Sequence, residues 1–170
     1  QKQMIQGARE AAASKAQRYC IVISGRSPLD REIDEIAGAV RSIKQEIPIQ
    51  ICCSLGLMSS EQAKRLKAAG VDRVNHNLNT SERYHTEICS THTFRDRLET
   101  LSICRDAGLE LCAGMIVGMG EQDDDVVDLG EPAEAREADD LQARAEALGG
   151  RLADQAFEVV LASVERAGEA

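Results

Sequence analysis

Runs of strand length alternate with amphipathic segments of helical length along residues 1–129, and this alternation limits the fold more than any other feature. Residues 19–23, 49–53, 71–81 and 109–117 each predict a strand. Strands that alternate with helices pair in parallel through right-handed crossovers. The sequence therefore predicts an α/β fold, either part of a TIM-type (β/α) barrel or a doubly wound sheet. Four strand-helix units would make half of an eight-unit barrel.

Residues at the ends of the helical segments predict where two of the helices begin and end. The first has Ser27 to cap it and Pro28 at its first position, and Pro48 ends it. The next begins with Ser59 and Gln62 in a capping-box pattern. It ends at Gly70, a residue favoured just past a helix.

Two more helices are expected, over residues 1–16 and 94–107. The second of these carries an apolar stripe of Phe94, Leu98 and Leu101, with Cys104 on its buried side. Residues 82–93 are expected to form a long connection ahead of it. Cys89 lies in this connection and receives no role from the pattern.

Composition excludes several classes of function. A net charge of -9 and a pI near 4.9 argue against a general nucleic-acid binder, which needs a basic face. No apolar run approaches the roughly 20 residues of a membrane span, and the N-terminus shows no signal peptide. A cytoplasmic setting is therefore expected, with no membrane partner. In that setting the six cysteines are thiols or metal ligands rather than disulfides.

The chain changes character near Leu129. Residues 130–170 hold ten acidic residues, four arginines and eleven alanines, and no Lys, Cys or His. Apolar residues keep helical spacing in this tail, from Leu141 to Val164. We therefore expect two parts, a partial β/α barrel over residues 1–129 and an acidic, Ala-rich helical tail over residues 130–170.

A row of amides lies in the third predicted strand. In an extended strand Asn75, Asn77 and Asn79 would point to one side, and the residues between them to the other. Amides must be satisfied when buried, so the row suits a wet or ligand-filled interior. An Asn-rich loop is the equally open alternative.

Cysteines lie within three of the predicted strands. Cys20, Cys52 and Cys112 could face a barrel interior, where thiolates could hold a soft metal or an iron-sulfur cluster. The spacing alone is weak support, because the sequence has no CxxC or CxxxCxxC pattern and most free cysteines are inert buried residues. Cys53 should face away from Cys52 and, like Cys104, is interpreted as a packing residue.

A glycine-rich run, Gly114-Met-Ile-Val-Gly-Met-Gly-Glu121, follows the last of these cysteines. Glycines let a ligand approach the backbone and expose amide hydrogens to it. A tight turn into the next helix explains the run equally well.

These stretches together resemble one family. The segments at residues 18–26, 52–57, 61–97 and 109–121, above all NHNLNTS and LCAGMIVGMGE, are similar to biotin synthase, within the radical S-adenosylmethionine enzymes. The resemblance covers roughly residues 5–129. It implies sulfur insertion into dethiobiotin, with S-adenosylmethionine cleaved at a 4Fe-4S cluster and a 2Fe-2S cluster as the sulfur source.

The resemblance also implies roles for individual residues. Cys20, Cys52 and Cys112 match three ligands of the 2Fe-2S cluster. Residues that match the binding of dethiobiotin or S-adenosylmethionine are Asn75, Asn77, Asn79, Arg97, Gly114, Ile116, Gly118 and Glu121.

The sequence departs from this family in one decisive respect. The CxxxCxxC loop that holds the 4Fe-4S cluster is absent, so this chain alone is not expected to cleave S-adenosylmethionine. A half barrel would also leave the edges of its outer strands without partners. Either the tail covers these edges, or the chain is unstable, or it pairs with a second copy as a homodimer. Two other functions stay open: a related radical S-adenosylmethionine barrel acting on another small molecule, and a non-catalytic remnant.

Overall fold

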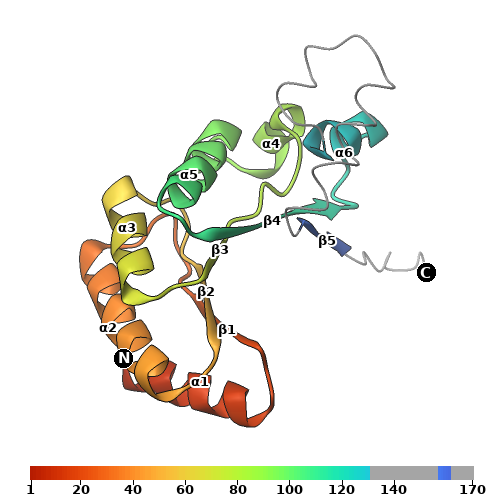
Figure 1. The fold of residues 1–170 in the computed structure, drawn as a ribbon. Helices are drawn as coiled ribbons and strands as arrows, with labels where there is room; N and C mark the ends of the chain where they lie inside the picture. The colour runs from red at the N-terminus through yellow and green to blue at the C-terminus, as the bar shows by residue number, and fades with distance from the viewer. Residues whose placement is uncertain (131–156, 162–170) are drawn as a thin grey trace, which may run out of the picture. The chain divides into compact units, whose positions relative to one another are not determined.

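The computed structural model describes residues 1–130 and 157–161 of the chain (Figure 1). They fall into two compact units, which are treated separately: residues 1–76 with 96–112, and residues 77–95 with the rest of the chain from 113. No helix in these described ranges is long and apolar enough to cross a membrane.

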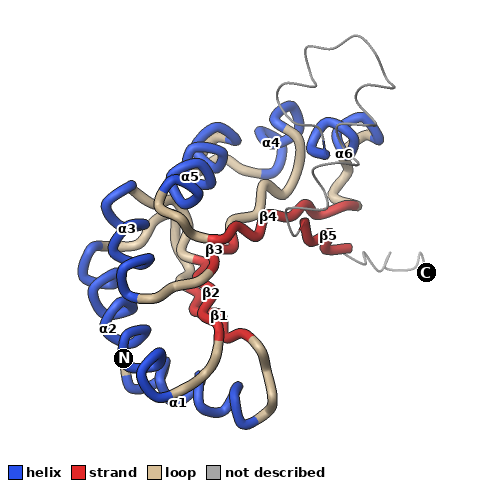
Figure 2. Tube along the Cα trace, in the orientation of Figure 1, coloured by secondary structure: helices blue, strands red, loops and turns tan. Residues whose placement is uncertain are grey.

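The first unit is a parallel sheet with helices between its strands, as the sequence predicts (Figure 2). Its elements are α1 (Lys2–Ala13), β1 (Arg18–Val22), α2 (Asp30–Glu46), β2 (Gln50–Ser54), α3 (Ser60–Ala69), β3 (Arg73–Asn75), most of α5 (Phe94–Asp106) and the start of β4 (Glu110–Val117). Parallel pairing joins β1 to β2, β2 to β3 and β3 to β4. Consecutive strands are thus neighbours, the arrangement of a β/α barrel.

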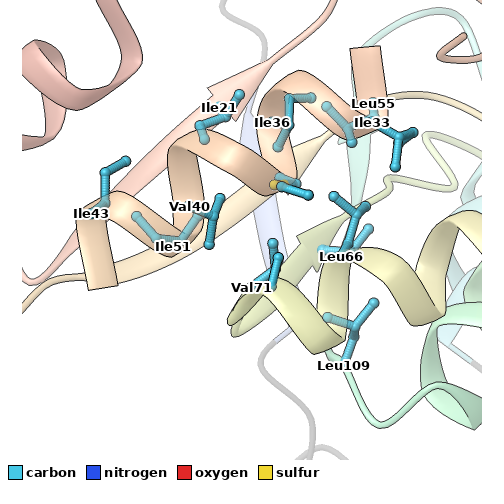
Figure 3. Packing of buried hydrophobic residues seen from close by; sticks show 14 of the residues in the cluster. Ile21, Ile33, Ile36, Val40, Ile43, Ile51, Leu55, Leu66, Val71 and Leu109 are labelled. Carbon is cyan, nitrogen blue, oxygen red and sulfur yellow. The ribbon is translucent and has the colours of Figure 1, made fainter. Parts of the chain in front are cut away.

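An aliphatic core lies between one face of this sheet and its helices. Figure 3 shows Ile36 and Val40 of α2 close to Ile51 of β2 and Leu66 of α3. All four side chains are at most 2% exposed. Residues alternate in direction along a strand, so the same face of β2 also brings Cys53 into this core. Cys104 of α5 is buried in it too, and both cysteines pack as predicted.

Hydrogen bonds of nearby side chains determine where α2 and α3 begin. The start of α3 is as predicted, and the start of α2 is not. Ser59 caps α3: its hydroxyl accepts from the Gln62 N–H at 3.3 Å, and Gln62 Oε1 accepts from the Ser59 N–H at 3.1 Å. Ser27 was expected to cap α2, but that helix begins at Asp30 with Leu29 as its N-cap residue. Glu32 explains the shift, because its Oε2 accepts from the Leu29 N–H at 2.7 Å.

The second unit contains α4 (Glu82–Ile88), the end of β4, α6 (Asp123–Gly130) and β5 (Phe157–Leu161). Helix α4 lies where the sequence predicted a connection without regular structure. Ser81 explains its start, since its hydroxyl accepts from the Tyr84 N–H at 3.1 Å.

Two further sequence predictions are wrong. Leu98 was placed in the apolar stripe of α5, but it is 42% exposed. The expected helical tail includes residues 157–161, but they form β5, which pairs in parallel with β4. Its sequence Phe-Glu-Val-Val-Leu is rich in β-branched and aromatic residues, which favours a strand. The rest of the predicted tail lies outside the described residues.

Candidate functional site

Two thiols lie side by side on the face of the sheet opposite the core. Cys20 of β1 and Cys52 of β2 are partners in the parallel register. A hydrogen bond between the two thiols is the main reason that the pKa of Cys20 is lowered to about 7. Partial burial raises this pKa, and the positive charge of Arg18 lowers it. The same hydrogen bond, with burial, raises the pKa of Cys52. At neutral pH roughly half of the Cys20 thiols are therefore ionised, and the thiolate is the form that binds metals and attacks electrophiles.

The neighbouring cysteine in β2 behaves differently. Cys53 pairs with Ile21 of β1 and is fully buried in the apolar core. Burial raises its pKa to about 12. The expectation that Cys52 and Cys53 face opposite ways is thus confirmed, and Cys53 stays a neutral thiol.

The third predicted ligand lies farther along the same sheet. Cys112 of β4 is the register partner of Asn75 in β3, whereas Cys52 is the partner of Arg73. Two strand spacings of about 4.8 Å, and two residues along the strand, thus separate Cys112 from Cys52. The Cys112 thiol nevertheless contributes to the raised pKa of Cys52.

Charged side chains share this polar face. Arg73 of β3 and Glu110 of β4 are register partners, with Nη2 and Oε2 3.1 Å apart. Residues 73, 75, 110 and 112 lie on one face because side chains alternate along a strand. The face therefore combines thiols, an amide and an ion pair, in contrast to the aliphatic face behind it.

The three predicted asparagines alternate in burial with the residues between them, as in a strand, but most of the row lies outside β3. Asn75, Asn77 and Asn79 are half-buried, and the residues between them, His76 and Leu78, are buried. The hydrogen-bonded strand β3 ends at Asn75, however, and the prediction of an extended strand through residue 81 is wrong. Asn79 explains part of the break, because its φ of 70° is left-handed, a conformation that Asn tolerates better than most residues.

Asn79 is joined directly to the glycine-rich end of β4. Its N–H donates to the Gly114 carbonyl at 3.0 Å, and its carbonyl accepts from the Ile116 N–H at 2.8 Å. These two bonds form an isolated parallel bridge between Asn79 and Met115. Three residues that the sequence placed at the binding site, Asn79, Gly114 and Ile116, are thus brought together in the second unit.

The turn after β4 is closed by its own acidic residue. Gly118 and Gly120 have φ values of 100° and 107°, which favour glycine. The Glu121 carboxylate accepts from the Gly118 N–H at 2.5 Å and from the Met119 N–H at 2.7 Å. These bonds, the Gly118 one foremost, lower the pKa of Glu121. The sequence left two interpretations of this run open, amide hydrogens offered to a ligand or a tight turn, and for the Gly118 and Met119 amides the structure shows a turn in which Glu121 is the acceptor.

A buried carboxylate that the sequence did not point out organises the second unit. Asp125 of α6 accepts a hydrogen bond from the Ser81 hydroxyl at 2.5 Å, and its other oxygen lies 2.5 Å from Arg83 Nη2. The Ser81 bond is the main cause of a lowered pKa for Asp125, helped by the Gln122 N–H and by Arg83. Asp125 was inconspicuous because it is the last of three consecutive aspartates. The available signal was Ser81, a capping residue two positions after Asn79.

A second bond holds the glycine turn to α4. The Tyr84 hydroxyl donates to the Met119 carbonyl at 3.1 Å. A Cβ on Gly120 would lie 2.7 Å from that hydroxyl oxygen, so the turn and the ring are closely fitted. The Asn79 bridge, the Asp125 bonds and Tyr84 thus fix the backbone on both sides of the glycine run.

The predicted site residues therefore form two groups. Cys20, Cys52, Cys112, Asn75 and Arg97 belong to the first unit, where Arg97 is half-buried on the first turn of α5. Asn77, Asn79, Gly114, Ile116, Gly118 and Glu121 belong to the second. The first group offers a soft donor set, two adjacent thiols and a third on the same face, which fits an iron-sulfur group. The second offers polar backbone and amides, which fit an organic ligand.

Comparison with known proteins identifies the superfamily of the chain. The model of the radical SAM superfamily matches residues 1–132. The chain is similar to the biotin synthase of Bacillus pumilus, with 46% identity over 141 residues, covering 83% of this chain and 43% of that protein. It is similar to the biotin synthase of Acaryochloris marina, with 54% identity over 129 residues, covering 76% of this chain and 37% of that protein.

A solved structure shows the same fold. Methylornithine synthase superimposes with a TM-score of 0.67 at 14% identity, over 94% of this chain and 43% of that one. This chain spans less than half the length of each of these relatives. Its fold is a partial parallel β/α barrel, and the chain belongs to the radical SAM superfamily, a family of enzymes that use S-adenosylmethionine and an iron-sulfur cluster.

Proposed function

We propose that this chain is a segment of a biotin synthase, the enzyme that inserts sulfur into dethiobiotin to form biotin. The observation that carries the proposal is the register pairing of Cys20 with Cys52 on the polar face of the sheet. Identities of 46% and 54% to biotin synthases support the assignment of substrate. In this proposal residues 1–129 are the barrel portion, and residues 130–170 are an appendage without an assigned role.

Cys20, Cys52 and Cys112 are proposed as three ligands of a 2Fe-2S cluster. Such a cluster, when bound, would supply the sulfur atom. The low pKa of Cys20 favours this role, because a thiolate ligand is present at neutral pH without a large proton cost. Arg73 and Glu110 form an ion pair on the same face. Because their charges cancel, the pair should have little net electrostatic effect on the thiols.

The remaining predicted residues are proposed to hold the organic ligands. Asn75 and Asn77 would bind dethiobiotin, and Asn79 the adenosyl ribose, through amide donors and acceptors. Arg97 would pair with the methionine carboxylate of S-adenosylmethionine.

The glycine turn has a more indirect part in this proposal. Because Glu121 accepts from the Gly118 and Met119 amides, it would shape the turn beside the adenosyl group rather than bind the ligand itself. Gly114 and Ile116 would present their backbone, which the bridge to Asn79 holds in place.

Anaerobic reconstitution with iron and sulfide tests the cluster assignment. The wild-type chain, Cys52→Ala and Cys53→Ala are compared for bound iron, bound sulfide and visible absorption. Cys52→Ala should lose the cluster absorption and Cys53→Ala should keep it, because the two neighbours face opposite sides of the sheet. Equal iron, sulfide and absorption in the wild type and Cys52→Ala would contradict the assignment and favour a non-catalytic remnant.

Cleavage of S-adenosylmethionine is a separate test. The six cysteines of this sequence include no CxxxCxxC loop, so the chain alone should release no 5′-deoxyadenosine when a reductant is added. Detection of that product would contradict the prediction. Sedimentation at several concentrations tests the further proposal that the chain pairs with a second copy, which predicts a mass that rises to that of a dimer.

A further inference from the structure

Three metal-ligating side chains converge in the second unit, in the sequence His85-Thr-Glu-Ile-Cys89-Ser-Thr-His92. One ligand atom from each of His85, Cys89 and His92 lies within 4.8 Å of the other two. His85 and Cys89 are four residues apart, on α4 and at its C-cap, and so share one face of the helix. His92 returns to that face after the chain leaves the helix.

The separations of these atoms suit a tetrahedral metal ion. Cys89 Sγ lies 3.6 Å from His92 Nδ1 and 3.7 Å from His92 Nε2. Around zinc, with Zn–S near 2.3 Å and Zn–N near 2.0–2.1 Å, neighbouring ligand atoms are roughly 3.3–3.6 Å apart. The Cys89–His92 pair is close to this separation with either ring nitrogen, at 3.6 Å for Nδ1 and 3.7 Å for Nε2. Since every pair of ligand atoms lies within 4.8 Å, His85 needs to approach by roughly 1.2–1.5 Å at most, which a change in its side-chain torsion angles provides.

The surroundings hold the ligands in place and leave a way in. His85 is 1% exposed, and its ring packs edge-on against Phe94 at a centroid distance of 6.0 Å. Cys89 and His92 are partly exposed, so an ion can enter from solvent. Thr91 Oγ1 lies 2.9 Å from His92 Nδ1. A hydrogen bond there orients the ring and leaves Nε2 as the ligand, as outer partners of metal-bound histidines do.

We propose that His85, Cys89 and His92 form a binding site for a zinc-class divalent cation, with water in the fourth position. One thiolate and two imidazoles are a ligand set that zinc prefers, and three protein ligands leave one position open. The ion joins the end of α4 to the segment that leads into α5. None of the three ligands belongs to the groups assigned to iron-sulfur or S-adenosylmethionine binding.

Cobalt titration of the metal-free 170-residue chain, followed by displacement with zinc, tests the site. The wild type should show the visible bands of tetrahedral Co²⁺ and a thiolate-to-cobalt charge-transfer band, and zinc should abolish both. Cys89→Ser should remove the charge-transfer band of this site. His92→Ala should weaken cobalt binding by more than about tenfold, since loss even of an outer partner costs 10–100-fold.

Control variants separate this site from the thiols of the sheet. Cys52→Ala should keep the charge-transfer band that Cys89→Ser loses, and Thr91→Ala should bind cobalt more weakly than the wild type but more tightly than His92→Ala. Circular dichroism checks that each variant keeps its helix content. Absence of cobalt binding by the wild type, an unchanged band in Cys89→Ser, or a band lost in Cys52→Ala and kept in Cys89→Ser would each overturn the proposal.

Discussion

Cys52 and Cys53 are the same residue type at adjacent positions of β2, yet they have opposite chemistry. Cys53 lies in the aliphatic core with a pKa raised to about 12 by burial. Cys52 faces the other way, where it shares a proton with Cys20 and holds the pKa of that thiol near 7. The alternation of side chains along a strand is sufficient to produce this difference. One face of the sheet provides stability, and the other is available for chemistry.

The largest expected effect comes from the core face. Ile51→Ala removes a side chain that is 0% exposed, beside Cys53 on the same face. It should lower the free energy of unfolding by about 2–5 kcal/mol, because it leaves a cavity in a close-packed core. Gln50→Ala, on an exposed neighbour that faces the other way, should cost less than about 1 kcal/mol. Urea denaturation of both variants checks the contrast, and equal losses would mean that the two faces do not differ in packing.

Asp125 extends the comparison to a position that is both buried and charged. Asp125→Asn keeps the size of the side chain but removes the charge that pairs with Arg83. It should destabilise the chain less than Ile51→Ala does, because the amide can keep part of the hydrogen bonding. The exposed neighbour Asp124→Asn is the matched control and should have little effect.

The stability lost in Asp125→Asn should depend on pH, and the pKa of Asp125 gives the direction of that dependence. The pKa of Asp125 is lower in the folded chain than its ordinary value of about 3.9. Its ionised form therefore adds stability above about pH 4, and that stability disappears as pH falls through the lower, folded value. Urea midpoints for the wild type and Asp125→Asn should differ most near neutral pH and converge in acid. A constant difference across this range would contradict the role of the charge.

The thiol face gives the next effect, in reactivity rather than stability. Cys20 should be alkylated by iodoacetamide with a midpoint near pH 7, and Cys53 should not react in the folded chain. Cys52→Ala removes the hydrogen bond that lowers the pKa of Cys20, so alkylation of Cys20 at pH 7 should slow by roughly tenfold. Cys53→Ala should leave the Cys20 profile in place. Peptide mass spectrometry measures each site, and an unchanged Cys20 rate in Cys52→Ala would show that the pair is not coupled.

Sequence periodicity was sufficient to predict most of the first unit. Helices α2 and α3 and strands β1 and β2 each follow a dominant local pattern, and the direction of Cys52 and Cys53 followed from the two-residue repeat of a strand. The second unit was harder to predict because the conformation or contacts of single residues determine its structure. Asn79 adopts a left-handed conformation, and Asp125 meets Ser81 from 44 residues away. Neither event leaves a periodic pattern in the sequence.

The smallest expected effect separates a real cap from an apparent one. Ser59 and Ser27 both precede a helix and both looked like caps, but the structure gives that role to Ser59 and Leu29. Ser59→Ala should lower the free energy of unfolding by about 1 kcal/mol, because the Gln62 N–H loses its acceptor. Ser27→Ala should change it by less than about 0.5 kcal/mol, since Ser27 is not the N-cap residue of α2 and the Leu29 N–H donates to Glu32. Urea denaturation of the two variants measures the difference, and an equal cost would mean that α2 extends toward Ser27 in solution.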